Sequence, residues 1–172
     1  LYPELVIDEK LNKLPKYLNK LLNQKYICFM VRDEAYLQGK FPEINWSYHS
    51  YRNSDPNEIS KLIKKILLEN KHCVRMGAKV SLDLGIKHKN YIDYAQNYRA
   101  ENLDFLLSKK CELFICDTSG IIYIALSQGA KVLRYNCNIY DMFKPYRNTL
   151  SVPVMYFDEL NNKILHYDEV ID

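Results

Sequence analysis

The sequence lacks the short motifs that identify most nucleotide and hydrolase sites. It holds no G-x-G-x-x-G after an apolar run and no G-x-x-x-x-G-K-[ST], which excludes the dinucleotide fingerprint and the P-loop. No D-x-D occurs, so the carboxylate pair that often holds a metal ion on a nucleotide sugar is missing, and no G-x-S-x-G elbow is present. The four histidines have no metal-ligand spacing. We therefore expect neither a metal site nor a bound cofactor.

An excess of charge of one sign is also missing. The 172 residues contain 24 Lys and Arg against 21 Asp and Glu, a net charge of +3. Nucleic-acid binding usually needs a concentrated basic face, so nucleic acid is not an expected partner. The length suits one compact domain and is short for two nucleotide-binding domains of ordinary size. Any anion site must come from a few well-placed groups.

Long apolar runs and paired cysteines are absent as well. No run approaches the roughly 18 residues that span a bilayer, and no signal-peptide pattern opens the chain. The five cysteines are odd in number and form no C-x-x-C pair, which favours buried free thiols in a reducing compartment. We expect a cytoplasmic protein. Because the first residue is Leu1, we also expect the chain to be a piece of a longer protein.

Apolar runs alternate with amphipathic helical patterns along the chain. The runs predict strands at residues 26–31, 72–76, 112–116 and 131–135, with a fifth at 152–157. Helices are predicted at residues 11–22 with Pro15 in the first turn, after an Asp55 cap, around residues 103–107, and at residues 121–128 before Gly129. Residues 33–54 form a long polar and aromatic stretch, and a loop of that length is usually either functional or wrongly assigned. Residues 78–99 fit no clear element. This order predicts an α/β fold, with a Rossmann-like parallel sheet and helices on both faces. We expect one domain over residues 1–172, with a helix within residues 1–24 leading into it.

Polar residues follow three of the predicted strands, where ligands bind in open parallel sheets. Arg32 and Asp33 follow the first strand, and Arg75 and Gly77 follow the second. The third is followed by a hydroxyl-glycine turn at a helix start, Asp117-Thr118-Ser119-Gly120. Arginine forks and free helical N–H groups both suit phosphate oxygens, so together these residues predict a pyrophosphate site. The plainer alternatives are surface arginines and an ordinary helix cap at the turn.

Two further candidates lie in the polar segment before the second helix. Tyr51 and Arg52 could stack on a base or bind phosphate, or belong to an exposed loop. Asp33 is a candidate general base, and the alternative is a structural pair with Arg32.

The order of these segments resembles a family of bacterial glycosyltransferases associated with surface-polysaccharide clusters. The resemblance covers residues 26–136, and more distantly residues 113–135 are similar to the nucleotide-sugar half of heptosyltransferases. Met30 stands where such families often have His. The segments that carry the resemblance are Val31-Arg32-Asp33, Ser50-Tyr51-Arg52-Asn53-Ser54-Asp55, Arg75-Met76-Gly77, Asp93-Tyr94-Ala95 and Asp117-Thr118-Ser119-Gly120.

The resemblance implies the donor-binding half of a GT-B fold. Arg32, Arg75, Ser119 and Gly120 would bind the donor phosphates, with Arg52 near the same charge. The implied partners are a nucleotide sugar, a glycan acceptor and an acceptor-binding domain outside this chain, with peripheral membrane association as a further expectation. The implied reaction is metal-independent glycosyl transfer in surface-polysaccharide synthesis.

Two other functions remain open on the sequence alone. A sugar-nucleotide epimerase without NAD would need acid/base groups on both sides of the sugar, for which Asp33 and Asp93 are the candidates. A non-catalytic domain for carbohydrate or protein recognition would leave Arg32 and Arg75 as ordinary surface charges.

Overall fold

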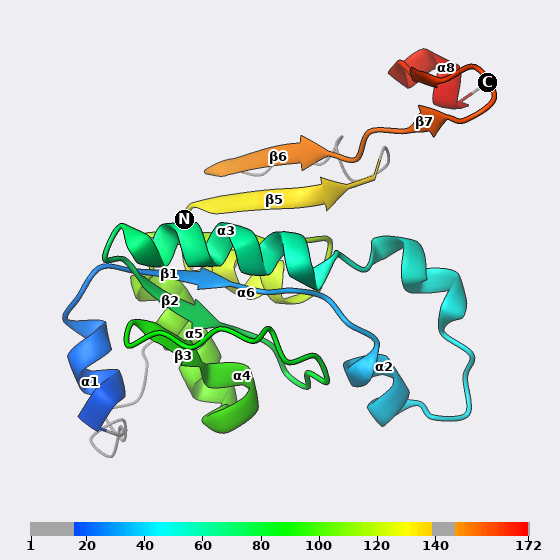
Figure 1. Cartoon of the computed structure of the whole chain (residues 1–172). Helices are drawn as coiled ribbons and strands as arrows, with labels where there is room; N and C mark the ends of the chain where they lie inside the picture. The colour runs from blue at the N-terminus through cyan, green and yellow to red at the C-terminus, as the bar shows by residue number, and fades with distance from the viewer. Residues whose placement is uncertain (1–15, 139–146, 172) are drawn as a thin grey trace.

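The computed structural model describes residues 16–138 and 147–171, and a six-stranded parallel sheet forms its centre (Figure 1). The strand order is β3-β2-β1-β4-β5-β6, with every neighbouring pair parallel. The order reverses between β1 and β4, so the carboxyl ends of these two strands form the switch point of the sheet. The predicted Rossmann-like α/β fold is confirmed. The strands are β1 (Tyr26–Phe29), β2 (His72–Arg75), β3 (Tyr91–Asp93), β4 (Leu113–Cys116), β5 (Val132–Cys137) and β6 (Thr149–Pro153).

Helices cover both faces of the sheet. Helix α3 packs on one face, where its residues Ile59, Ile63 and Leu67 join the core with Ile27 and Phe29 of β1. On the other face, α1, α4, α5 and α6 surround a second core. The helices are α1 (Lys16–Leu22), α2 (Ala35–Lys40), the 3₁₀ helix η2 (Ser47–Arg52), α3 (Pro56–Leu68), α4 (Tyr94–Asn97), α5 (Glu101–Lys110), α6 (Ile121–Ser127) and α8 (Tyr167–Ile171).

Burial on both faces explains why the residues of β1 form a continuous apolar run. Tyr26 and Cys28 belong to the core under α5 and α6, whereas Ile27 and Phe29 belong to the core under α3. Because successive side chains of a strand point to opposite faces and both faces are covered, every position of β1 is buried.

Several predicted helix boundaries are confirmed. Asp55 caps α3 by accepting a hydrogen bond from the Asn57 N–H at 2.8 Å. Helix α6 ends before Gly129, whose φ of 74° allows the chain to turn away. The first described residue of the N-terminal helix is Lys16, and its predicted first turn, with Leu11, Leu14 and Pro15, lies outside the described residues. All five cysteines are free, and all but Cys111 are buried.

Of the two alternatives for residues 33–54, the structure favours a wrongly assigned loop. This segment contains α2 and η2, which the sequence hides because Gly39 lies inside α2 and the segment is rich in polar and aromatic residues. The unassigned residues 78–99 contain the edge strand β3, which has only three residues. The fifth predicted strand begins earlier than expected, as β6 at residues 149–153, and residues 154–156 lie outside any strand.

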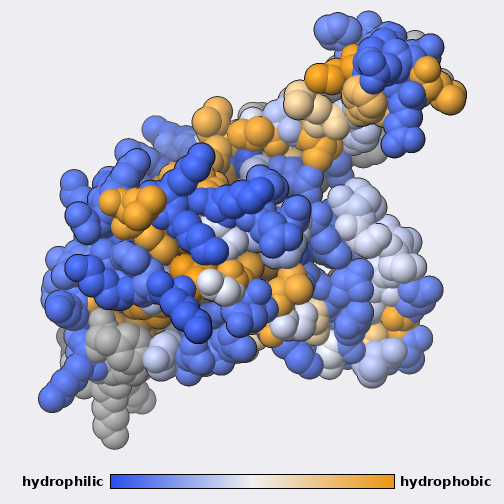
Figure 2. Space-filling view, viewed as in Figure 1, coloured by the Kyte–Doolittle hydropathy of each residue, from blue (hydrophilic) through white to orange (hydrophobic). Residues whose placement is uncertain are grey.

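Beyond β6 the chain leaves the body of the molecule. Strands β7 (Phe157–Asp158) and β8 (Lys163–Ile164) pair with each other as an antiparallel hairpin, followed by α8. Met155, Phe157 and Leu160 are exposed, and Figure 2 shows apolar residues among hydrophilic ones in this projecting part. Within residues 16–138 and 147–171, no helix has the length and apolar character needed to cross a membrane.

Candidate functional site

A buried carboxylate joins the strands at the switch point. Asp117, directly after β4, is fully buried, and its Oδ2 accepts hydrogen bonds from the Arg32 N–H at 2.7 Å and the Ser54 hydroxyl at 3.1 Å. Its Oδ1 has no hydrogen-bond partner among the described residues. Burial raises the pKa of Asp117 to about 6, although both hydrogen bonds and the charges of Arg32 and Arg52 act in the opposite direction. The ionised Asp117 side chain therefore lowers the stability of the fold, but it joins the ends of β1 and β4 to the segment that holds Ser54.

Two guanidinium groups lie beside this carboxylate and are held by neutral partners. Arg32 Nε donates to the Asn53 side-chain oxygen at 3.2 Å, and Arg52 Nη2 donates to the Thr118 carbonyl at 2.7 Å. Among the described residues, neither guanidinium has a carboxylate oxygen within 4.0 Å of its nitrogens. Partial burial, followed by the charge of Arg52, lowers the pKa of Arg32. The pKa of His49 is also lowered, first by desolvation and then by the two arginines.

A pocket of about 770 Å³ opens over the carboxyl ends of β1, β2 and β4. Its volume lies in the usual range for small-molecule sites, and its place at the switch point is where open parallel sheets bind ligands. Two carboxylates line it, Asp33 and Asp104, and Asp104 forms an ion pair with Arg99 at 3.2 Å. The cationic side chains that line it are Arg32, Lys40, Arg52, Lys79 and Arg99. Positive charge therefore exceeds negative charge around the pocket.

The turn after β4 borders the pocket as the sequence predicts. Ser119 and Gly120 both line it, and the Ser119 hydroxyl lies 2.9 Å from the sulfur of Met30. Gly120 is exposed, and a Cβ built on it would meet nothing within 4 Å, so a ligand has room to approach this backbone. Thr118 is buried, and its hydroxyl has no hydrogen-bond partner among the described residues. Neither hydroxyl caps α6, which corrects one expectation: Gly120 is the cap residue, without a side-chain bond.

The Asp33 carboxylate accepts hydrogen bonds from backbone N–H groups and does not pair with Arg32. Its Oδ1 accepts from the Ala35 N–H at 3.1 Å, at the start of α2, and its Oδ2 accepts from the Ser81 and Leu82 N–H groups at 2.8 and 3.4 Å. The predicted pair with Arg32 is therefore replaced by an anchor for the loop after β2. The role of general base stays a prediction, and these hydrogen bonds already occupy both oxygens of the carboxylate.

Position 77, in the wall of the pocket, requires glycine for steric reasons. Its φ is 151°, and a Cβ on this residue would lie 2.9 Å from Cγ1 of Val80. A side chain at this position would be strained both in backbone and in packing.

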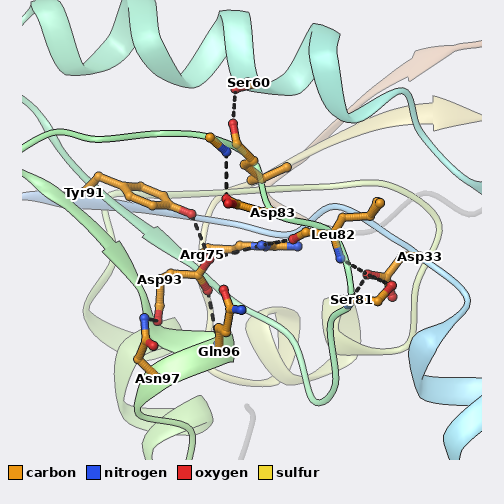
Figure 3. Close-up of polar contacts among 12 residues, drawn as sticks. Asp33, Ser60, Arg75, Ser81, Leu82, Asp83, Tyr91, Asp93, Gln96 and Asn97 are labelled. Atoms are coloured by element: carbon orange, nitrogen blue, oxygen red, sulfur yellow. Dashed lines mark hydrogen bonds and ion pairs between the residues drawn. The ribbon is translucent and has the colours of Figure 1, made fainter.

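The structure does not bring Arg75 to the pocket, which corrects its predicted grouping with Arg32. Arg75 is fully buried, and Figure 3 shows its guanidinium directed at Asp93 and the Leu82 carbonyl, at 3.0 and 2.6 Å. The Tyr91 hydroxyl donates to the same Asp93 oxygen at 3.1 Å. The two arginines are not equivalent, because Arg75 is the last residue of β2 whereas Arg32 follows the end of β1 by three residues. Arg75 pairs across the sheet with Asp93 of β3.

The two remaining candidates, Tyr51 and Asp93, line two other hollows. Tyr51 is 64% exposed and borders a small hollow of about 150 Å³, which Arg52 and Thr118 also line. A larger hollow of about 800 Å³ follows the edge strand β3 and is lined by Asp93. Asp33 and Asp93, the two acid/base candidates for an epimerase, therefore line different hollows, and that function stays a prediction.

The sequence missed several residues that complete the site. Ser54 and Asn53 belong to the predicted polar segment, but nothing in the pattern shows that they bond to Asp117 and Arg32. Lys40 lies at the end of a helix that has no apolar pattern in the sequence, and Lys79 lies in the stretch that fits no clear element. Arg99 has no local pattern that distinguishes it from a surface charge.

Among residues 16–138 and 147–171, no group of three His, Cys, Asp or Glu side chains is arranged to hold a metal ion. Comparison of the chain with protein-family models, curated proteins and solved structures finds no match. The geometry of the pocket therefore carries the functional argument.

Proposed function

We propose that the pocket at the switch point binds the diphosphate of a nucleotide sugar, and that the chain is the donor-binding half of a glycosyltransferase with a GT-B fold. One observation carries this proposal. Arg32 and Arg52 lie at the reversal point of a Rossmann-like sheet, in a pocket of ligand size, without carboxylate partners among the described residues.

The chemistry of the two arginines supports a diphosphate ligand. A guanidinium offers several N–H donors in one plane, and each of these arginines uses a single N–H for its neutral partner, Asn53 or Thr118. Negative charge develops on the diphosphate as the bond to the sugar breaks. Two fixed positive charges beside it would stabilise the leaving group without a metal ion. Asn53 and Thr118 hold the guanidiniums in place before the ligand arrives, which lowers the cost of binding.

The remaining parts of the proposal follow from the same site. A donor-binding half needs a second domain to supply the glycan acceptor, so a partner domain outside this chain belongs to the proposal. Transfer would take place in the cytoplasm, during surface-polysaccharide synthesis and at a membrane surface. Because this chain would hold the donor alone, we expect binding without appreciable transfer.

Calorimetry with UDP-, GDP- and ADP-sugars tests the proposal, with and without EDTA. Arg52→Gln should weaken binding of the preferred donor by at least about tenfold, since it removes a charge-assisted contact to phosphate. Lys64→Gln is the matched control, because Lys64 is an exposed cation on α3 away from the pocket. The proposal fails if no donor binds, if EDTA abolishes binding, or if Arg52→Gln binds as tightly as the control. Binding of a free glycan that is indifferent to Arg52 would instead favour a non-catalytic recognition domain.

A further inference from the structure

A second pair of cations lies in the same pocket and is not explained by a diphosphate. Lys40 ends α2, and Lys79 lies in the loop after β2, and both side chains line the pocket. Both residues are exposed. Among the described residues, neither ammonium group has a carboxylate oxygen within ion-pair distance, whereas Lys61, Lys71 and Lys163 each have one.

Both ammonium groups lie against residues of α2 or the residue that follows it. A Cβ built on Gly39 would lie 2.1 Å from Nζ of Lys79, so this ammonium occupies the space that a side chain at position 39 would fill. The next residue is Lys40, whose Nζ lies 3.4 Å from the Tyr36 hydroxyl and 5.5 Å from the centre of the Phe41 ring. These partners are uncharged. They place the ammonium without compensating its charge.

The charged groups that line the pocket do not balance one another. Arg99 is neutralised by Asp104, and the two charges of a diphosphate would match Arg32 and Arg52. Of the remaining lining groups, Lys40 and Lys79 are positive and Asp33 is negative. Asp117 supplies a further negative charge beside Arg32 and Arg52 but does not line the pocket, so the lining itself keeps one positive charge, which Lys40 and Lys79 carry. A ligand that fills the pocket therefore gains most if it carries one further anionic group in addition to the diphosphate.

We infer that the donor is a nucleotide sugar whose sugar carries a carboxylate, and that Lys40 and Lys79 bind this carboxylate. The inference rests on the proposed function, since it assumes that the diphosphate lies at Arg32 and Arg52. The lysines then select acidic sugars over neutral ones. A carboxylate accepts hydrogen bonds from both ammonium groups, whereas a neutral CH₂OH group offers them no charge.

Matched pairs of donors test this selectivity directly, because UDP-glucuronic acid and UDP-glucose differ only in that group, as do GDP-mannuronic acid and GDP-mannose. Calorimetry should give at least about tenfold tighter binding of the acidic member of the accepted pair, and the ratio should shrink as salt is added. Lys40→Gln and Lys79→Gln should each bring the ratio toward one, because each weakens binding of the acidic donor more than binding of the neutral donor. Lys64→Gln should keep the ratio of the unmodified protein.

The outcomes separate this inference from the proposed function. Equal binding of the acidic and neutral donors overturns the inference and leaves the diphosphate site intact. The inference is also overturned if the lysine variants weaken both donors equally, since the lysines would then hold phosphate. If no member of either pair binds, the proposed function fails and the inference fails with it. Because both lysines are exposed, both variants should fold, and circular dichroism checks this.

Discussion

Replacing the buried carboxylate at the switch point should make the protein more stable at neutral pH. Asp117 is fully buried and its pKa is raised from 3.8 to about 6. In Asp117→Asn, the side-chain oxygen can still accept from the Arg32 N–H and the Ser54 hydroxyl. The new amide group takes the place of Oδ1, which has no hydrogen-bond partner among the described residues. The substitution therefore removes a buried charge and keeps the hydrogen bonds from Arg32 and Ser54.

The size of the effect follows from the pKa. A shift of about 2 units makes the ionised form of Asp117 cost ~3 kcal/mol in the folded state. An unsatisfied amide N–H gives back about 1 kcal/mol of this, so the expected gain is about 2 kcal/mol above pH 7. For a chain of this size, that corresponds to roughly 4–8 °C in Tm.

The dependence on pH gives the sharper test. Because the folded pKa lies above the unfolded one, the folded protein binds the proton more tightly. Its stability therefore falls as the pH rises from about 4 through about 6. Urea denaturation of the unmodified protein at pH 4.5, 6 and 8 should show this loss, and Asp117→Asn should lack it. Asp83→Asn is the control, since Asp83 is an exposed loop carboxylate. A variant that is less stable at pH 8, or a difference that does not change with pH, would refute the reasoning.

Three other predictions concern the walls of the pocket and the sheet beside it. Gly77→Ala should lower the free energy of unfolding by about 1–3 kcal/mol, because position 77 has a φ of 151°. Gly120→Ala should melt near the unmodified protein, because position 120 has a φ of −63° and open space around it. Equal melting temperatures of the two variants in calorimetry would contradict this. Inorganic pyrophosphate should raise the lowered pKa of His49 by offsetting the nearby arginine charges, and an unchanged imidazole titration by NMR would place the anion elsewhere. Arg75→Met should cost about 3–5 kcal/mol by leaving Asp93 without its ion pair, and adding Asp93→Asn should recover part of the loss in urea denaturation. A double variant no more stable than the single one would argue against that pairing.

The sequence predicts the sheet well because the sheet is buried on both sides. The residues of β1 and β4 read as apolar runs, and the Asp55 cap marks the start of α3. Elements that lack such a pattern were missed. The edge strand β3 is only three half-buried residues, and α2 contains a glycine and is mostly exposed. A strand that is buried on both faces is apolar throughout and can be recognised in the sequence. An edge strand or surface helix has few buried residues and gives no such pattern.

The candidate site is predictable only in part, because the sequence does not fix the residue at which each strand ends. Arg32 and the Ser119 turn meet at the switch point as expected, since both follow central strands. Arg75 looks equivalent to Arg32 in the sequence, but it is the last residue inside β2 and pairs with Asp93 across the sheet. An offset of a few residues separates a pocket residue from a buried ion pair.

The charge of the pocket depends on a segment that is not part of the sheet. Lys40 lies on α2 and Arg52 on η2. Hydrogen bonds attach this segment to the sheet: Ser54 to Asp117, Arg52 to Thr118, and Asn136 to Asn53. Few of its side chains are buried, so its attachment rests on these hydrogen bonds more than on apolar packing. An anion bound between Arg32 and Arg52 would add contacts that exist only when the segment is in place. Anion binding at the pocket would therefore be coupled to docking of residues 33–54, and each should stabilise the other.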